Sequence, residues 1–121
     1  MSSARVAFGK IGEDLACAEL ERRGYAIVAR RYRRRYGEVD IIARDGPTLV
    51  FIEVKSRSGR GFGGGGEAVT PIKQRRMAAV ALDYLARQRL VGCLCRFDVV
   101  SIDTEGGNTR IEVYQNAFLA R

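Results

Sequence analysis

The chain has 121 residues, of which 46% are hydrophobic, so it is long enough for one modest core and too apolar for a disordered protein. Lysine and arginine number 21 against 14 aspartates and glutamates, which makes the formal net charge +7 and the isoelectric point about 9.8. Such a charge favours a polyanionic partner, most simply nucleic acid. The absence of histidine excludes Ser-His and Cys-His catalysis.

We expect a cytoplasmic protein with a single domain, residues 1–121, and no membrane partner. No apolar run is long enough to span a bilayer, and the N-terminus does not resemble a signal sequence. The three cysteines, Cys17, Cys93 and Cys95, are an odd number and predict reduced thiols, the last two packed in the interior. Three cysteines without histidine do not favour a zinc site.

Residues 3–23 predict a helix that ends at Gly24, because apolar residues recur at helical spacing. Glu13 lies at the edge of this apolar stripe, from which its carboxylate could reach over a sheet toward Asp40. The alternative is a carboxylate at the rim that contacts only water.

Residues 25–29 predict the first strand, and a basic run with two tyrosines, residues 30–36, follows it. Basic side chains neutralise phosphates, and aromatic rings stack on unpaired bases. We therefore predict nucleic-acid contacts at Arg31, Arg33, Arg34 and Arg35. The alternative is a solvated edge strand whose charge prevents aggregation.

Two apolar strands flank the turn at residues 45–48 and carry the charged residues Asp40, Glu53 and Lys55. Charges in apolar strands cost free energy unless they are paired or used. Glu53 and Lys55 share a face, and if Asp45 opposes Thr48, Asp40 opposes Glu53. Because Gly-Pro is not a favoured two-residue turn, we expect a four-residue loop in the same register.

Asp40, Glu53 and Lys55 would then crowd one position. Two carboxylates ~5 Å apart repel by roughly 3 kcal/mol at an effective dielectric constant of ~20. Lys55 offsets part of this repulsion, and a divalent cation such as Mg²⁺ offsets more. The arrangement favours metal-dependent phosphodiester cleavage. The alternative is a surface ion pair between Glu53 and Lys55 beside a solvated Asp40.

The glycine-rich segment after Lys55, residues 56–66, predicts a loop beside the site, with Arg57 and Arg60 as phosphate contacts; a simple linker is the alternative. Thr70 and Pro71 predict the N-cap and first turn of a second helix. Strands over residues 94–102 and 109–114 follow. Asp98, a lone acid between apolar neighbours, indicates a salt bridge or core cap rather than catalysis.

Four motifs carry a resemblance that covers nearly the whole chain. They are Gly12-Glu13, Gly37-Glu38-Val39-Asp40, Phe51-Ile52-Glu53-Val54-Lys55 and Arg96-Phe97-Asp98-Val99-Val100. The pair Asp40 and Glu53-Val54-Lys55 resembles the PD-(D/E)XK nuclease superfamily. The four motifs in order resemble the bacterial YraN family, which is similar in layout to archaeal Holliday-junction resolvases.

The resemblance implies an α/β, restriction-endonuclease-like fold with a mixed central β-sheet flanked by helices. It also implies that an acid on the first helix, Glu13, completes a metal site. A polar residue on the second helix, Lys73 or Gln74, would lie near the catalytic lysine, although both could simply form an exposed basic helix start. Positions 31 and 36 depart from the asparagine and glycine expected in the family.

Together these observations predict a Mg²⁺- or Mn²⁺-dependent DNA endonuclease, with selectivity for branched DNA if the likeness to resolvases extends to substrate. Asp40, Glu53 and the Val54 carbonyl would hold metal, Lys55 would assist the attacking water, and Glu13 would support a second metal or water. Junction cleavage needs two sites and hence a homodimer. The main alternative is a nucleic-acid-binding module with an unused site. An interaction protein without a nucleic-acid role would leave the charge unexplained.

Overall fold

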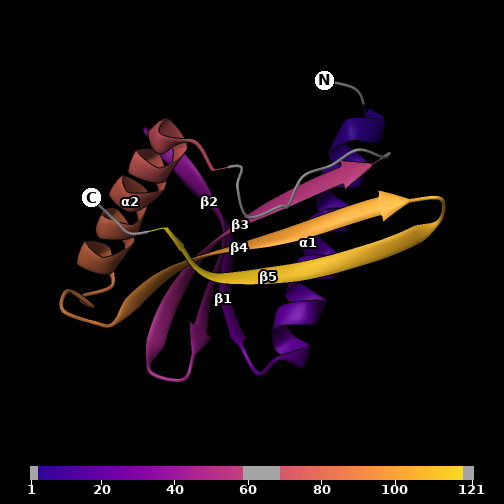
Figure 1. The fold of residues 1–121 in the computed structure, drawn as a ribbon. Coiled ribbons are helices and arrows are strands. Elements are labelled where there is room, and N and C mark those ends of the chain that lie inside the picture. Colours follow the sequence, from indigo (N-terminus) through magenta and orange to yellow (C-terminus); the bar gives the residue numbers. More distant parts are fainter. Residues whose placement is uncertain (1–2, 59–68, 119–121) are drawn as a thin grey trace.

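The computed structural model describes residues 3–58 and 69–118 and contains two helices and five strands in the order predicted from the sequence (Figure 1). Their bounds are α1 Ser3–Arg22, β1 Ala26–Arg34, β2 Gly37–Asp45, β3 Thr48–Ser58, α2 Pro71–Arg87, β4 Cys95–Glu105 and β5 Asn108–Phe118.

The strands form one mixed sheet in the order β1-β2-β3-β4-β5. Only β3 and β4 pair in parallel among these neighbours, and α2 forms the crossover between them. A parallel neighbour needs such a crossover, as the sequence predicted. The fold is therefore α/β, with a mixed sheet and flanking helices consistent with a restriction-endonuclease-like architecture.

Three strands are longer than predicted. β1 continues through the basic run to Arg34, and β4 and β5 extend to Glu105 and Phe118. Backbone pairing with β2 holds the extension of β1, while the side chains of Arg30, Arg31 and Arg33 remain exposed. Charge in a strand therefore did not end it, because an edge strand can direct charged side chains into water.

The β2–β3 connection is tighter than predicted. Asp45 pairs directly with Thr48, so the connection consists of Gly46 and Pro47, and the expectation of a four-residue loop is wrong. Gly46 has φ +60°, which fits the first central position of a type II′ turn. Proline can take the second position because that position needs a negative φ. The predicted register is nevertheless confirmed.

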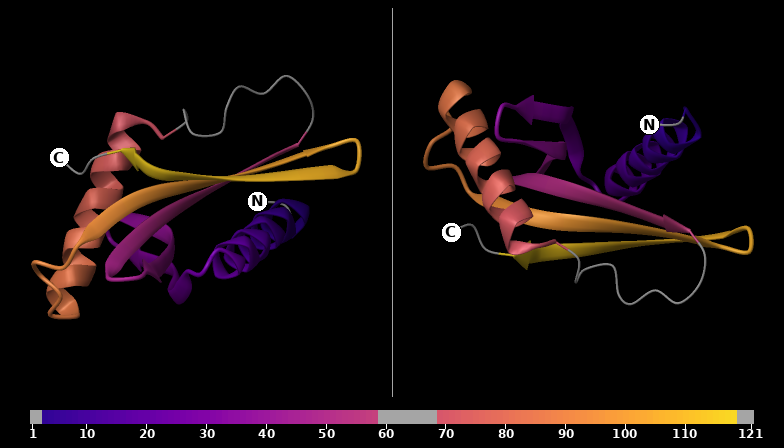
Figure 2. Two further views of the ribbon diagram at one scale, coloured as in Figure 1. Left: turned by 60° about the horizontal axis from the view of Figure 1, so that its bottom comes forward. Right: turned by 90° about the horizontal axis from the view of Figure 1, so that it is seen from above.

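The two helices pack on different faces of the sheet, and the residues of one strand alternate between them (Figure 2). The core under α2 includes Phe51 and Val80, and the core under α1 includes Leu20 and Ile52. All four of these side chains are fully buried. The alternation places Glu53, two residues after Phe51, on the α2 face.

Two glycines of the family-like motifs allow each helix to approach the sheet. A Cβ on Gly12 of α1 would lie 2.1 Å from the Ser56 Oγ on β3. A Cβ on Gly37 of β2 would lie 3.2 Å from the Arg76 Cβ on α2. Gly37 thus brings the start of β2 directly against the first turns of α2.

Asp98 is structural, as its surroundings in the sequence indicated. It is fully buried, and its carboxylate accepts hydrogen bonds from the Tyr25 hydroxyl, the Arg96 guanidinium and the Asn116 backbone N–H. Arg96 also forms an ion pair with Asp45 at 2.9 Å. This network explains the Arg96–Val100 motif without a role in chemistry.

The cysteine prediction is half right. Cys17 is buried, and Cys93 packs partly buried against the core under α2. Cys95 is exposed at the start of β4, so its prediction as a packed thiol is wrong. Within residues 3–58 and 69–118, no helix is long and apolar enough to cross a membrane.

The close approach at Gly12 is testable. Gly12→Ala should lower the melting temperature, because the added methyl meets Ser56 and overpacking costs roughly 1–3 kcal/mol. The higher helix propensity of alanine than of glycine offsets up to ~1 kcal/mol of this cost. In a Ser56→Ala background, which removes the nearest atom, the same change should cost clearly less. Equal losses in both backgrounds would show that Ser56 does not limit the approach of α1.

Candidate active site

The centre of the site is the point at which β2 leaves its pairing with β3. The paired residues run from Asp45 and Thr48 to Ile41 and Ile52, so the next pair in this register is Asp40 and Glu53. Here the Asp40 carboxylate accepts a hydrogen bond from the Val54 backbone N–H at 2.8 Å. A side chain therefore satisfies a β3 backbone donor in place of the β2 backbone.

The pleat of β2 is irregular at Asp40. Val39 and Ile42 both pack in the core under α2, although they are three residues apart, whereas Ile41 packs under α1. Strict alternation would put Val39 and Ile42 on opposite faces. The irregularity turns the segment from Gly37 to Asp40 toward α2.

Asp40 and Glu53 open into a cavity of about 380 Å³ between the sheet and the first turns of α2. Its lining residues are Gly37, Glu38, Asp40, Glu53, Thr70, Ile72, Lys73, Arg76 and Met77. Thr70 forms the N-cap of α2, as predicted, and its side chain accepts from the Lys73 backbone N–H. The cap fixes the helix start that forms one wall of the cavity.

The crowding of the two carboxylates is visible in the protonation of Asp40. Burial, the charge of Glu53 and a hydrogen bond between the two carboxyl groups raise the pKa of Asp40 from 3.8 to about 8, against the opposing effect of the Val54 N–H. Burial is the larger cause and the charge of Glu53 the second, and a proton on Asp40 relieves both over most of the neutral range.

Lys73 forms an ion pair with Glu53, whose side chain is almost completely buried. Gln74 instead donates to the Val69 carbonyl at 2.9 Å, which links α2 to the residue just before its N-cap. Of the two polar candidates on α2, Lys73 is therefore the one beside the carboxylates. Lys55 lies two residues after Glu53 on β3 and is partly buried.

Glu13 does not contact Asp40. It is buried on α1, where its carboxylate accepts hydrogen bonds from the Arg30 and Arg31 guanidinium groups. Arg31 has φ +52°, a left-handed conformation that favours asparagine, the residue expected there in the family. Glu13 thus clamps α1 to β1, and its predicted metal role gains no support from this geometry.

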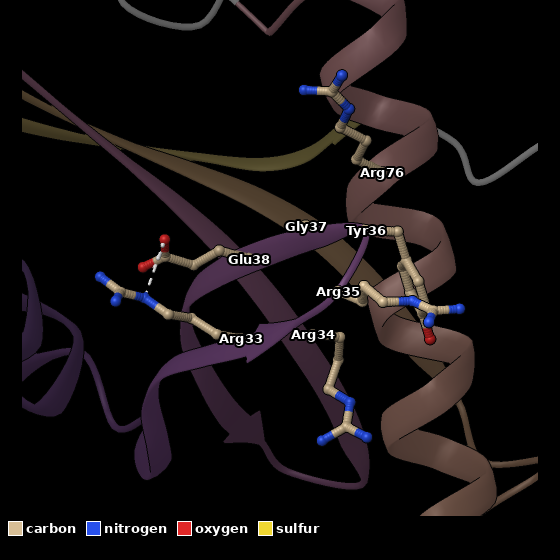
Figure 3. Close-up of a pocket in the computed structure, with 7 residues that line it drawn as sticks. All are labelled: Arg33, Arg34, Arg35, Tyr36, Gly37, Glu38 and Arg76. Atoms are coloured by element: carbon tan, nitrogen blue, oxygen red, sulfur yellow. Dashed lines mark ion pairs between the residues drawn. The ribbon is translucent and has the colours of Figure 1, made fainter.

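A second cavity adjoins the first at the β1–β2 hairpin (Figure 3). Its lining residues are Arg33, Arg34, Arg35, Tyr36, Gly37, Glu38 and Arg76. Gly37, Glu38 and Arg76 also line the first cavity, the one that holds Asp40 and Glu53, so the two cavities are contiguous. Three of the six arginines predicted to contact nucleic acid, all from the basic run, therefore line a cavity that is contiguous with the one at Asp40 and Glu53.

The arginines of the second cavity differ in their partners. Arg33 lies 3.4 Å from Glu38, and Arg34 lies 2.8 Å from Asp83 of α2. In the part of the chain that the structure describes, Arg35 and Arg76 have no carboxylate partner. In Figure 3, Arg76 extends from α2, opposite the hairpin that carries the others. These two cations are available for an anion.

The other arginines and tyrosines predicted to contact nucleic acid are less well placed to do so, with the exception of Tyr36. Arg57 lies on β3, 3.9 Å from Asp103 of β4, and Arg60 lies outside the described residues. Of the two tyrosines, Tyr32 packs edge-on against Tyr84, with ring centroids 5.1 Å apart, so it is part of the core. Tyr36 is 45% exposed and is the one that can reach a base.

The donor set at Asp40 and Glu53 fits Mg²⁺ or Mn²⁺. These are hard cations that bind through one or two carboxylates, with water completing the shell. Among residues 3–58 and 69–118, no group of three or more histidine, cysteine, aspartate or glutamate side chains comes together. The fit is therefore to a two-carboxylate site rather than to a closed protein cage.

Sequence reasoning missed two residues of this site. Arg76 joins the two cavities, and Glu38 lines both. Glu38 could have been found from its place in the Gly37–Asp40 motif. The sequence places Arg76 near the start of the second helix, but its position over Gly37 depends on how α2 packs on the sheet.

Comparison with known proteins places the chain in a family. The profile of the uncharacterised protein family UPF0102 matches residues 12–102. The chain belongs to the UPF0102 family. This confirms the resemblance to YraN proteins drawn from the four motifs.

Relatives in the family are similar over almost their whole length. A UPF0102 protein of Syntrophus aciditrophicus is 48% identical over 91% of this chain and 87% of its own. One from Geobacter metallireducens is 47% identical over 98% and 97%, and one from Symbiobacterium thermophilum is 50% identical over 93% and 96%. The names of these relatives carry no activity, so function must be argued from the site.

Asp40→Asn should raise the melting temperature in the presence of chelator. The amide keeps an acceptor for the Val54 N–H and is neutral at every pH, so folding at neutral pH no longer requires the carboxyl beside Glu53 to take up a proton. A gain of ~1 kcal/mol corresponds to several degrees for a domain of this size. Asp40→Ala is the matched control, since it leaves the Val54 donor without its acceptor and should gain less or lose stability. A destabilised Asp40→Asn would contradict the crowding.

The pH dependence of stability should distinguish the wild type from Asp40→Asn. Asp40 is protonated in the folded state up to about pH 8 but ionises near pH 4 when unfolded, so the folded state holds the extra proton in between. The free energy of unfolding of the wild type should therefore fall as pH rises from about 4 to 8. The Asp40→Asn variant should lack this component, which chemical denaturation at several pH values measures.

Proposed function

We propose that this protein is a metal-dependent endonuclease that hydrolyses phosphodiester bonds in DNA. The observation that carries the proposal is the close pair Asp40 and Glu53 at the floor of a cavity that continues into an arginine-lined cavity. A protein that only bound nucleic acid would gain nothing from two adjacent carboxylates near phosphate.

Asp40 and Glu53 would hold Mg²⁺ or Mn²⁺, with the Val54 carbonyl as a further ligand. The bound ion would supply Lewis-acid stabilisation of charge on the phosphoryl oxygens. Lys55, on the same strand face as Glu53, would orient the attacking water and stabilise the negative charge that develops as it loses its proton. The water oxygen would form a bond to phosphorus as its proton passes to solvent. The P–O bond to the leaving deoxyribose oxygen would break, and that oxygen would take up a proton from solvent.

The adjoining cations would hold the DNA backbone in place. Arg35 lines the arginine cavity, Arg76 lines both cavities, and neither has a carboxylate partner within the described residues. Arginine presents a planar fork that suits phosphate oxygens. The exposed ring of Tyr36 in the same cavity can stack on an unpaired base, which favours branched or single-stranded substrates over intact duplex.

A nucleic-acid-binding module with an unused nuclease site is the second candidate. The contact of Lys73 with Glu53 favours it, because the carboxylate then already has a cation. Binding through the arginine cavity needs neither metal nor Lys55. The two candidates differ in whether DNA is cut.

The first test is a cleavage panel on linear, flapped, single-stranded and four-way DNA with Mg²⁺ and Mn²⁺. The wild type should cut at least one substrate, and Asp40→Ala, Glu53→Ala and Lys55→Ala should each abolish cleavage while the fold is retained by circular dichroism. Glu21→Gln, an exposed acid on α1, is the control and should cut normally. A wild type that binds but cuts none of the four would leave the binding module as the function.

The second test measures binding against salt. Each phosphate contact contributes a slope of about −0.9 to the dependence of log affinity on log salt concentration. Replacing Arg35 and Arg76 with alanine should flatten this slope by about two units, and the further loss of Arg33 and Arg34 should flatten it more. Arg110→Ala is the control, since Arg110 lies on β5 and is paired with Glu112. Equal effects from all these arginines would place the DNA elsewhere.

A further inference from the structure

The ion pair of Lys73 with Glu53 occupies the position that the proposed function, on which this inference rests, assigns to a divalent cation. We propose that Lys73 is an exchangeable counter-cation of the carboxylate site. A metal ion displaces it from Glu53, and the released ammonium then serves with Arg76 as a contact for the DNA phosphate. Lys73 thereby couples metal binding to DNA binding.

The two partners of the ion pair differ in their freedom to move. The side chain of Glu53 is 5% exposed, whereas that of Lys73 is 48% exposed. Glu53 is held in the sheet, but Lys73 is attached through four flexible carbons. The buried carboxylate needs a cation, but that cation need not be the lysine, whose charged end remains in contact with water. The lysine is thus the partner that can leave when a metal ion takes its place on Glu53.

The position of Lys73 in α2 shows what keeps it in place. Lys73 lies in the first turn, two residues after Pro71, where the helix dipole disfavours a cation. The Thr70 cap satisfies the Lys73 backbone N–H but does nothing for its charge. The ammonium therefore depends on an anion outside the helix, which is Glu53 in the described state and would be a phosphate once Glu53 holds metal.

The cavity offers that second anion position. Lys73 and Arg76 are three residues apart, so they share one face of α2, and both line the cavity with Asp40 and Glu53. Arg76 also lines the arginine cavity. A released Lys73 would add a cation to a surface that already leads toward DNA. Because linkage is reciprocal, metal should strengthen DNA binding and DNA should strengthen metal binding.

The test is a titration of the DNA-free protein with Mn²⁺, followed by electron paramagnetic resonance, for wild type, Lys73→Met and Arg76→Met. Both substitutions remove one positive charge from the same cavity wall, but only Lys73 contacts Glu53. Lys73→Met should bind Mn²⁺ roughly two- to fivefold more tightly than Arg76→Met, the range expected when a half-exposed ion pair need not be broken.

The second measurement is DNA affinity with and without Mn²⁺, made in a Lys55→Ala background so that the DNA stays intact. Added Mn²⁺ should strengthen binding for this parent, and adding Lys73→Met should reduce that gain by roughly two- to fivefold. If wild type binds Mn²⁺ and Lys73→Met and Arg76→Met have the same metal affinity, the exchange is wrong while the nuclease proposal stands. If wild type binds no Mn²⁺, both fail.

Discussion

Two carboxylates held against each other are the constraint on which the local structure depends. Their gross repulsion is on the order of 3 kcal/mol at ~5 Å and an effective dielectric constant of ~20, a sizeable part of the stability of a small domain. Three features offset it: the proton on Asp40, the Val54 N–H donated to the same carboxylate, and the Lys73 ammonium on Glu53. Natural sequences keep such costs where a site uses them, which is why the carboxylates point to chemistry.

Two of the four motifs lie at the candidate site, and two lie in the packing around it. Gly37–Asp40 and Phe51–Lys55 build the site, and Gly37 contributes by letting β2 touch α2. Gly12 lets α1 approach β3, and its neighbour Glu13 fastens that helix to β1 through Arg30 and Arg31. The buried Asp98 network closes the other end of the sheet. Two of the four motifs therefore lie in the packing around the candidate site.

The net charge of +7 overstates the surface available to a polyanion. Arg30 and Arg31 bind Glu13, Arg34 binds Asp83, and the guanidinium of Arg96 lies within the Asp98 network. Arginine suits such partly buried pairs because its fork donates to both carboxylate oxygens. What distinguishes the proposed DNA surface is the position of Arg76 at the carboxylate cavity and of Arg35 in the cavity that adjoins it, rather than the number of basic residues in the chain.

The sequence by itself determined the order of elements, the parallel pairing of β3 with β4 and the register that brings Asp40 to Glu53. These follow from local periodicity, turn position and the length of a crossover, which are all written along the chain. Tertiary structure alone decided which cations meet which acids. Glu13 accepts a hydrogen bond from Arg31 and is not beside Asp40. Lys73 forms an ion pair with Glu53, and Arg76 lines both cavities. Which long side chains come within reach of one another depends on how the helices pack on the sheet, and no local sequence pattern encodes that packing.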